Sequence, residues 1–75
     1  MNRVDKLILS CLKDKKEKRT SEIAKSIDRQ IGGFFYSLKN LMNEKCIRQI
    51  DYGVYQITEI GIKTIELEEL KEKLR

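Results

Sequence analysis

Residues 29–47 constrain the fold of this chain more than any other stretch. Their large apolar side chains recur at i, i+4, i+7 and i+8, which is the spacing of one helical stripe. These side chains are Phe34, Leu38, Leu41 and Met42. We therefore expect a helix that is buried along this stripe and is covered by other elements of the fold.

The opposite face of this helix is polar and carries no acidic residue before Glu44. It presents Tyr36, Lys39, Asn40 and Asn43, with Phe35 at its edge. Most amphipathic helices turn such a face to water. Amide, ammonium and aromatic groups also suit contacts with base edges in the major groove of DNA, so both interpretations stay open on this evidence.

Two further helices are expected before this stretch. Apolar residues at i, i+3, i+4, i+7 and i+8 predict a helix from Arg3 to about Asp14. Its expected buried face carries Val4, Leu7, Ile8, Cys11 and Leu12. A short helix follows, capped by Thr20 or Ser21 and ending near Asp28. Few residues separate it from the next apolar stripe, so the two helices must turn sharply, as in a helix-turn-helix.

The run between these two helices, residues 13–19, holds five basic and two acidic residues and nothing apolar. We expect it to form a solvated loop. Next to DNA, its flexible lysines would also reach phosphates, because such contacts need only proximity to the backbone.

The last third of the chain predicts a hairpin and a helix. Residues 48–51 and 54–58 alternate and are rich in strand-forming types, with Tyr52 and Gly53 as the turn and Gly53 available for positive φ. A final helix is expected from Glu59 to Arg75. Its apolar positions are Ile62, Ile65, Leu67, Leu70 and Leu74.

Charge is unevenly distributed along the 75 residues, whose formal net charge is +4. Residues 1–58 hold 12 Lys or Arg against 7 Asp or Glu, whereas residues 59–75 hold 4 against 5. The basic excess lies in the part that contains the polar helix face, which favours a polyanionic partner. A chain this short buries only about 60% of its unfolded surface, so either its packing is unusually good or a second subunit completes the core.

The composition argues against several classes of protein. Two cysteines without histidine do not supply a tetrahedral zinc site, so neither a metal nor another cofactor is expected. Cys11 and Cys46 lie in apolar patterns and are expected to be buried free thiols, with a disulfide as the alternative. No general base, activated nucleophile or phosphate loop is present, so no enzymatic activity is expected. The lack of a membrane-spanning run or signal peptide predicts a cytoplasmic protein with no membrane partner.

Three segments, in this order, resemble the winged helix-turn-helix domain of bacterial and archaeal transcriptional regulators. Residues 19–25 resemble the start of the family's second helix, residues 38–48 the end of its recognition helix, and residues 55–61 the exit from its wing. Within this family, the three segments resemble most those of MarR-like, ArsR-like and small archaeal or viral regulators. The resemblance implies an α+β fold with three helices, a two-stranded β-hairpin wing and a C-terminal helix, in one domain over residues 1–75.

Two departures from the family pattern bear on this expectation. The family usually has glycine where Lys45 stands, because the recognition helix ends in a left-handed residue. Lys45 must accept that conformation at some cost in stability, or the helix must end differently. Asp51 stands at the tip of the wing and would repel phosphates, so deep insertion of the wing into the minor groove is not expected.

The resemblance places the helix of residues 29–47 in the major groove. Its base contacts are expected from Tyr36, Lys39 and Asn40, because lysine pairs with guanine, asparagine with adenine, and an aromatic edge meets the thymine methyl. Gly32 and Gly33 would let the start of the helix approach DNA closely, or they only shape the turn.

Phosphate contacts are expected from the elements on either side of this helix. Ser21, Lys25 and Arg29 would position the domain on the backbone. Arg48 and Tyr52 would touch the backbone from the wing. We expect Phe35 to be partly buried against the hairpin or a neighbouring molecule instead of contacting bases.

The leading hypothesis is a sequence-specific protein that binds double-stranded DNA and regulates transcription. The resemblance implies a homodimer, paired through the first helix, the last helix (about residues 59–75) or both. No small-molecule ligand is expected, because so small a domain leaves little room for a pocket. One alternative is a winged-helix module that binds other proteins through Phe35 and Tyr36, and another is a chromatin-type protein that coats DNA without sequence preference.

Overall fold

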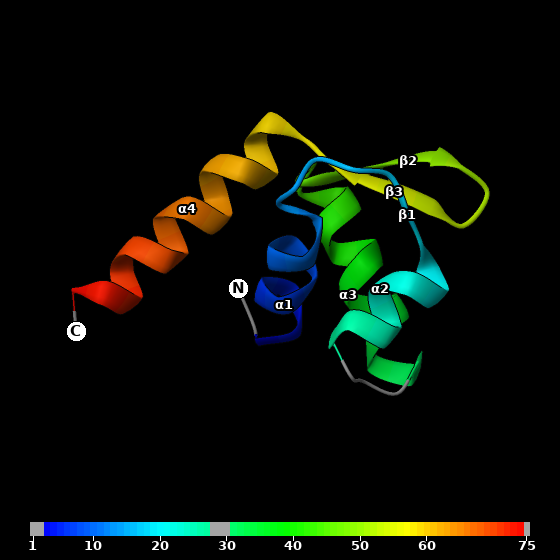
Figure 1. The fold of residues 1–75 in the computed structure, drawn as a ribbon, viewed down its shortest axis with the longest axis horizontal. Coiled ribbons are helices and arrows are strands. Elements are labelled where there is room, and N and C mark those ends of the chain that lie inside the picture. The colour runs from blue at the N-terminus through cyan, green and yellow to red at the C-terminus, as the bar shows by residue number, and fades with distance from the viewer. Residues whose placement is uncertain (1–2, 28–30, 75) are drawn as a thin grey trace.

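The computed structural model describes residues 3–27 and 31–74 of the chain. Its elements in order are α1 (Arg3–Leu12), β1 (Lys18–Arg19), α2 (Thr20–Ile27), α3 (Ile31–Asn43), β2 (Ile47–Asp51), β3 (Val54–Ile57) and α4 (Glu59–Lys73). The strands form an antiparallel sheet in the order β1-β3-β2. In Figure 1 the sheet lies above α2 and α3, while α4 extends outward beyond α1. The expected α+β class with four helices is confirmed.

The number of strands differs from the expectation of a two-stranded hairpin. Part of the basic run expected to be a solvated loop is the third strand, β1, which pairs Lys18 with Tyr55 and Arg19 with Val54. This strand forms because the chain leaving α1 passes along the outer edge of β3. There its backbone pairs with the N–H and C=O groups of β3 that β2 does not reach. The register is continued by Thr20, whose N–H donates to the carbonyl of Gly53 at 2.9 Å.

The hydrophobic core lies where α1 packs against α2, α3, α4 and β3. The predicted stripe of α3 is confirmed, since Phe34, Leu38 and Leu41 are almost fully buried. The predicted face of α1 is partly wrong. Its fully buried apolar residues are Ile8, Leu9 and Leu12, whereas Val4, Leu7 and Cys11 only pack against the edge of the core. Because α1 is surrounded on several sides, its apolar stripe alone does not determine which face is most deeply buried.

The end of α3 takes the left-handed conformation, which is one of the two outcomes that the family resemblance left open for Lys45. Lys45 has φ 63°. Its N–H donates to the carbonyl of Met42 at 3.0 Å, and the N–H of Cys46 donates to the carbonyl of Leu41 at 2.9 Å. These two bonds form a Schellman motif, which satisfies the last carbonyls of the helix and turns the chain into β2.

The β2–β3 hairpin turns through Tyr52 and Gly53, as expected, and Gly53 has φ 70°. Ile47 pairs with Ile57 at its base, and Asp51 pairs with Val54 next to the turn. Between Gln49 and Asp51 the register shifts, so β2 carries a bulge. Such a bulge increases the local twist of the hairpin.

The junction between β3 and α4 explains why a glycine stands at Gly61, in the segment 55–61 that resembles the exit from the family's wing. Thr58 caps α4, because its hydroxyl accepts a hydrogen bond from the N–H of Gly61 at 3.1 Å. The N–H of Thr58 donates to the carbonyl of Cys46 at 2.9 Å. A Cβ on Gly61 would lie 2.1 Å from that same carbonyl oxygen. Only glycine therefore lets α4 begin this close to the end of α3.

The start of α2 differs from the expected cap. Thr20 is the first residue of α2, and its hydroxyl donates to the carbonyl of Gly53 at 3.1 Å. The carboxylate of Glu22 instead accepts a hydrogen bond from the N–H of Arg19 at 3.3 Å. This is one half of a capping box, with the acidic residue satisfying the donor that precedes the helix.

Both cysteines are free thiols. Cys46 is buried, as expected, and this burial raises the pKa of its thiol. Cys11 is only half buried, because the edge of α1 that carries it is not fully covered. Across the described part of the chain, no helix combines the length and the apolar character needed to cross a membrane.

Candidate nucleic-acid interface

The outer face of α3 is exposed, as the polar pattern predicts. The side chain of Tyr36 is 67% exposed, and Lys39 is exposed one turn further along the helix. Asn40 is only partly exposed, because it lies closer to the buried stripe. The three residues expected to contact bases therefore share one accessible surface, with Asn40 at its border.

Phe35 is half buried, with 51% of its side chain exposed. Its expected cover by the hairpin or by a neighbouring molecule stays a prediction. Its ring lies 5.7 Å from that of the buried Phe34, measured between centroids, with the two planes inclined by 35°. A half-exposed aromatic ring in contact with Phe34 therefore lies on the same helix as the exposed Tyr36 and Lys39.

The glycines lie in the first turn of α3, as expected. Gly33 is exposed, and a Cβ added there would meet nothing within 4 Å. Its backbone therefore lies at an open surface, and a side chain at this position is excluded by no neighbour. Gly32 lies in the same turn. Arg29, the third expected phosphate contact, lies outside the described residues.

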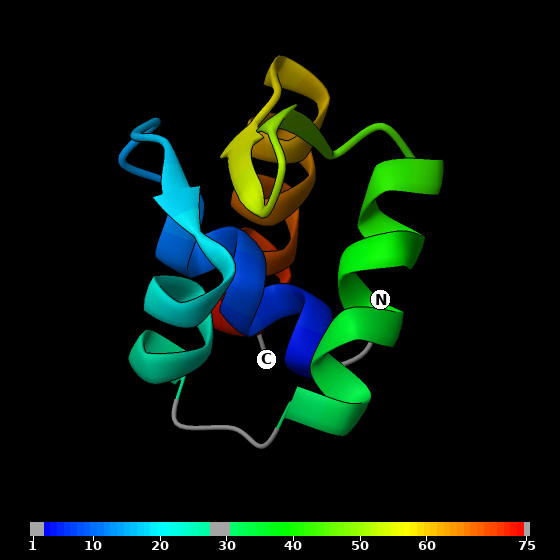
Figure 2. The ribbon, with the colours of Figure 1, turned by 90° about the vertical axis from the view of Figure 1, so that its right-hand side faces the viewer.

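Two expected phosphate contacts lie on α2, where Ser21 and Lys25 are both exposed. Figure 2 looks onto this side of the molecule and shows α2 and α3 on either side of α1, with the hairpin between and above them. Arg19 in β1 is also exposed, immediately before α2. The sequence interpretation placed Arg19 at the end of the basic loop and at the start of the second helix, and in the structure it pairs with Val54.

The hairpin contributes the remaining expected contacts. Tyr52 at its tip is 95% exposed, and its N–H donates to the carboxylate of Asp51 at 2.7 Å. Arg48 is exposed and donates to the side-chain oxygen of Gln56 at 2.8 Å. Gln56 donates in turn to the carbonyl of Lys15 at 2.8 Å. The guanidinium of Arg48 is thus held along the sheet and keeps further donors for a ligand.

The ion pairs gather on the opposite side of the molecule. Lys6 of α1 lies 2.9 Å from Glu72 of α4, and Lys13 lies 2.6 Å from Glu69. The hydrogen bond to Glu69 raises the pKa of Lys13, so this lysine stays charged. None of the ion pairs found within residues 3–27 and 31–74 involves a base of α2, α3 or the hairpin. The acids of α4 are therefore matched locally, while the cations around α3 face solvent.

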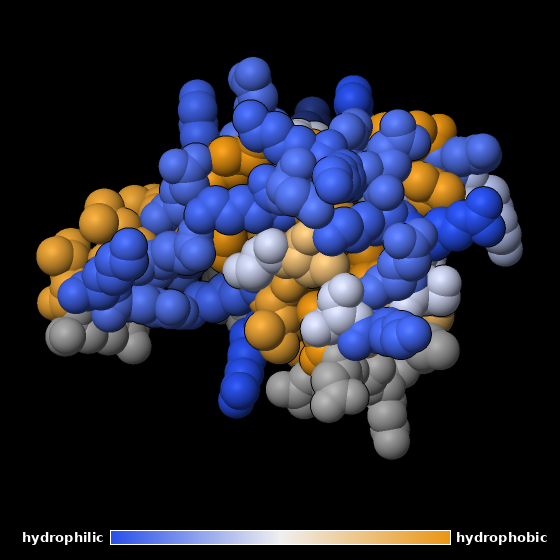
Figure 3. Space-filling model, viewed as in Figure 1, coloured by the Kyte–Doolittle hydropathy of each residue, from blue (hydrophilic) through white to orange (hydrophobic). Residues whose placement is uncertain are grey.

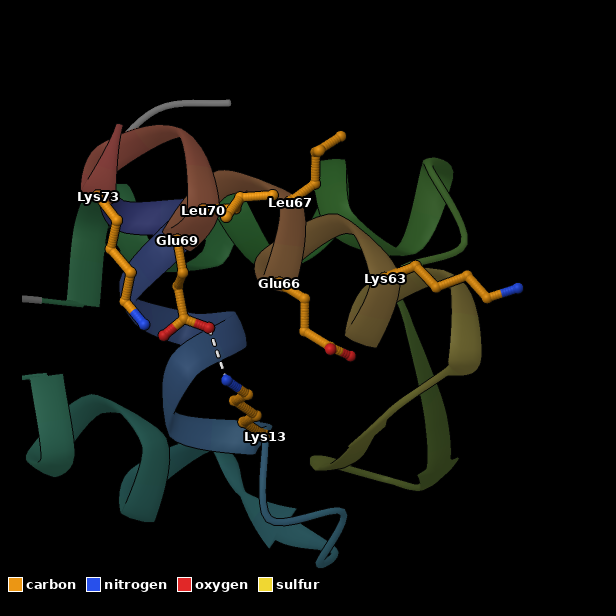
Figure 4. A pocket seen from close by; sticks show the side chains of 7 residues that line it. All are labelled: Lys13, Lys63, Glu66, Leu67, Glu69, Leu70 and Lys73. Atoms are coloured by element: carbon orange, nitrogen blue, oxygen red, sulfur yellow. Dashed lines mark hydrogen bonds and ion pairs between the residues drawn. The ribbon is translucent and has the colours of Figure 1, made fainter. Parts of the chain in front are cut away.

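The hollows on the surface are not typical ligand sites. One of about 560 Å³ lies where α4 passes the end of α1, and most of its lining side chains are charged. Figure 4 shows the Lys13–Glu69 ion pair on one side of it and Leu67 pointing away from that pair. Small-molecule pockets are usually concave and mostly apolar, with a few polar groups.

Among solved structures, this chain is similar to the crystal structure of quinone-bound YodB from B. subtilis. The two superpose with a TM-score of 0.82 at 23% sequence identity, over 97% of this chain and 81% of the YodB chain. A likeness at this level of identity shows a shared fold and nothing about function. No protein-family model and no curated protein matches the chain.

Proposed function

We propose that this chain is a winged helix-turn-helix protein that binds double-stranded DNA in a sequence-specific way and regulates transcription. α2 and α3 would form the helix-turn-helix, with α3 in the major groove, and the β2–β3 hairpin would be the wing. Tyr36, Lys39 and Asn40 would contact bases. The observation that carries this proposal is the outer face of α3, which offers an ammonium, an amide and aromatic rings and includes no acid.

The distribution of charge supports the same partner. Ser21 and Lys25 on α2 and Arg48 on the hairpin are exposed on elements that flank α3. These groups suit phosphate contacts, which position a protein on the duplex without reading its sequence. A polyanion would meet cations on this side and the carboxylates of α4 on the other, so it would approach in one orientation.

The test is a selection of preferred sites from random double-stranded DNA, followed by titration of the selected site at about 50 and about 200 mM salt. We expect affinity to fall with salt along a log–log slope of about −0.9 per phosphate contacted. The variant Lys39→Ala is expected to lose roughly tenfold in affinity for the selected site and much less for unrelated DNA.

The matched control is Lys63→Ala, which removes the same charge from an exposed position on α4. It should leave binding of the selected site nearly unchanged. Equal affinity for every DNA fragment would instead identify a protein that coats DNA without preference. Binding of another protein through Phe35 and Tyr36, with no salt-sensitive binding of DNA, would identify an interaction module, which the exposure of these two rings also suits.

We propose further that α4 pairs two copies of the chain. Its exposed apolar side chains are Ile60, Leu67, Leu70 and Leu74, which are 51%, 53%, 52% and 78% exposed. They are spaced at i, i+7, i+10 and i+14, so they form one stripe along the helix. In Figure 3 the free end of α4 is hydrophobic, in contrast to the largely hydrophilic surface around it. Two such stripes, packed across a twofold axis, would cover each other.

Sedimentation over a range of concentrations tests this pairing. Leu67→Glu is expected to weaken the dimer roughly 100-fold. Because the dimer is twofold, the substitution removes one buried leucine from each copy and brings two carboxylates together. Tyr52→Glu is the matched control, since it adds the same charge at an exposed residue of the hairpin tip and should leave the dimer intact. A wild-type chain that stays monomeric at high concentration would contradict the proposal.

We propose that binding of DNA needs no small-molecule effector. The charged, surface-lying hollow beside α4 supports this, as does the small size of the core. The related YodB structure contains a quinone, so quinones are the first compounds to examine. A quinone that raises the melting temperature of this chain, or changes its affinity for the selected DNA, would contradict the proposal.

A further inference from the structure

The exposed ring of Phe35 has no part in the function proposed above. It is 51% exposed, although the buried stripe of α3 is already complete without it. We propose that Phe35 reads the 5-methyl group of thymine in the major groove, so that preferred sites carry thymine where the first half of α3 meets the bases. This inference rests on the proposed binding of DNA and adds a specificity-determining residue to it.

The chemistry of the side chain limits what it can read. A phenyl ring has no hydrogen-bond donor or acceptor in its plane, so it distinguishes bases only by apolar contact. The thymine methyl is the one apolar group that the base edges present in the major groove. Removing a methyl-sized group from water against such a ring changes affinity roughly fourfold.

The ring is held in place before any ligand arrives. Its centroid lies 5.7 Å from that of Phe34, whose side chain is only 1% exposed. This buried neighbour supports one side of Phe35 and restricts its rotamers. Little conformational freedom is then lost when the free side of the ring meets a base, which favours a contact that discriminates.

The surroundings of Phe35 leave room for a duplex. Side chains on a helix lean toward its start, and Gly33 precedes Phe35 by two residues. A Cβ at Gly33 would find no atom within 4 Å, so the surface at Gly33 is open. Lys39 follows Phe35 by four residues and shares its face of the helix, where it would attract phosphates or pair with an adjacent guanine.

Charge decides between DNA and a protein as the partner of this aromatic edge. Lys39 on α3 and Lys25 on α2 are exposed, and within the described residues neither of them forms an ion pair. α3 itself contains no acid, and Glu44 follows the last residue of the helix. A polyanion complements such a surface better than a neutral or basic protein does.

The experiment uses the site selected from random DNA and replaces its thymines with uracil, one position at a time. This exchange removes only the methyl group and keeps Watson–Crick pairing. We expect the wild-type chain to lose roughly fourfold in affinity at one or two thymines. Phe35→Ala should bind the thymine and uracil forms of these positions equally, because the group that senses the methyl is gone.

Two further variants complete the comparison. Phe35→Leu keeps an apolar end and should retain part of the preference for thymine. Tyr36→Ala should retain the preference at the same positions, although its affinity is lower overall. Equal binding of thymine and uracil by the wild type at every position would overturn the inference, as would a preference that persists in Phe35→Ala.

These outcomes are distinct from a failure of the proposed function. A wild-type chain that selects no sequence at all would overturn the DNA-binding proposal and this inference with it. A chain that selects a site in a salt-dependent way, yet ignores the thymine methyl, would overturn the inference alone.

Discussion

α3 and α4 are helices of similar length with opposite surfaces. α3 has 13 residues and buries Phe34, Leu38 and Leu41, while its outer face carries aromatic, amide and ammonium groups. α4 has 15 residues, and within the described structure its fully buried residues are Gly61 and Ile65. Its leucines face outward, and its acids pair with lysines of α1.

The difference teaches that an apolar residue in a small domain is not by itself a core residue. Leu38 and Leu70 are both leucines in long helices, yet one is 1% and the other 52% exposed. α3 is enclosed by the fold, so its stripe is filled from within the chain. Within the described residues α4 packs mainly against α1 and β3, so its outer stripe is not covered by this chain.

The largest expected effect compares these two leucines. Leu38→Ala should lower the free energy of unfolding by about 4 kcal/mol, because it leaves a cavity in the core. Leu70→Ala should lower it by less than about 1 kcal/mol at concentrations where the chain is monomeric, since its side chain is half exposed there. Urea denaturation at low and high protein concentration measures both. Similar losses for the two variants at low concentration would contradict the contrast drawn between α3 and α4.

The next effect compares the first turns of the two helices. Gly61→Ala should destabilise the fold by about 3 kcal/mol, because the new Cβ would lie 2.1 Å from the carbonyl oxygen of Cys46 and 2.7 Å from Ile57. Gly33→Ala should stabilise it by about 0.5–1 kcal/mol, since the added methyl meets nothing and alanine favours the helix. Thermal melting of both variants provides the measurement. A stable Gly61→Ala variant would show that the junction of β3 and α4 is looser than described.

A smaller effect is expected where α3 ends. Lys45→Gly should raise the free energy of unfolding by about 1 kcal/mol, because glycine adopts the φ of 63° without the steric penalty that lysine has. Lys63→Gly, inside α4, should lower it by about 1 kcal/mol. The same denaturation experiments compare the two. A loss of stability in both variants would argue against the Schellman motif at the end of α3.

The smallest effect concerns phosphate contacts. Lys25→Ala should weaken binding to all DNA sequences alike and reduce the salt slope by about 0.9, because it removes one counterion-releasing contact. Lys73→Ala, on α4, should leave the slope unchanged. Titration at several salt concentrations gives both values. A loss confined to the selected site would instead make Lys25 a base-reading residue.

Much of the fold could be predicted from local pattern. The stripe of α3 and the glycine turn of the hairpin follow from residue types and spacing, because each depends on a few neighbouring residues. The left-handed residue at Lys45 was one of the two outcomes that the family resemblance left open. The third strand could not be predicted in this way. Lys18 and Arg19 have no strand signature of their own, and they pair only because the chain passes the edge of β3.

The residue types of the candidate site could be predicted from the sequence, but the packing of its side chains could not. The polar face of α3 follows from helical periodicity, and its exposure at Tyr36 and Lys39 agrees with that. The element that covers the buried half of Phe35 could not be predicted, because it depends on the direction in which β2 leaves α3. The same limit applies to α1, where Leu9 is buried through contacts from several elements.

The two hydrogen bonds from Thr20 to the carbonyl of Gly53 have a mechanical consequence. They fasten the beginning of α2 to the tip of the hairpin, so these two distant parts of the chain cannot spread or close independently. The spacing between α2 and the hairpin is therefore restricted. If the chain binds DNA as proposed, sequences that deform easily would fit this spacing best, even at base pairs that no side chain touches.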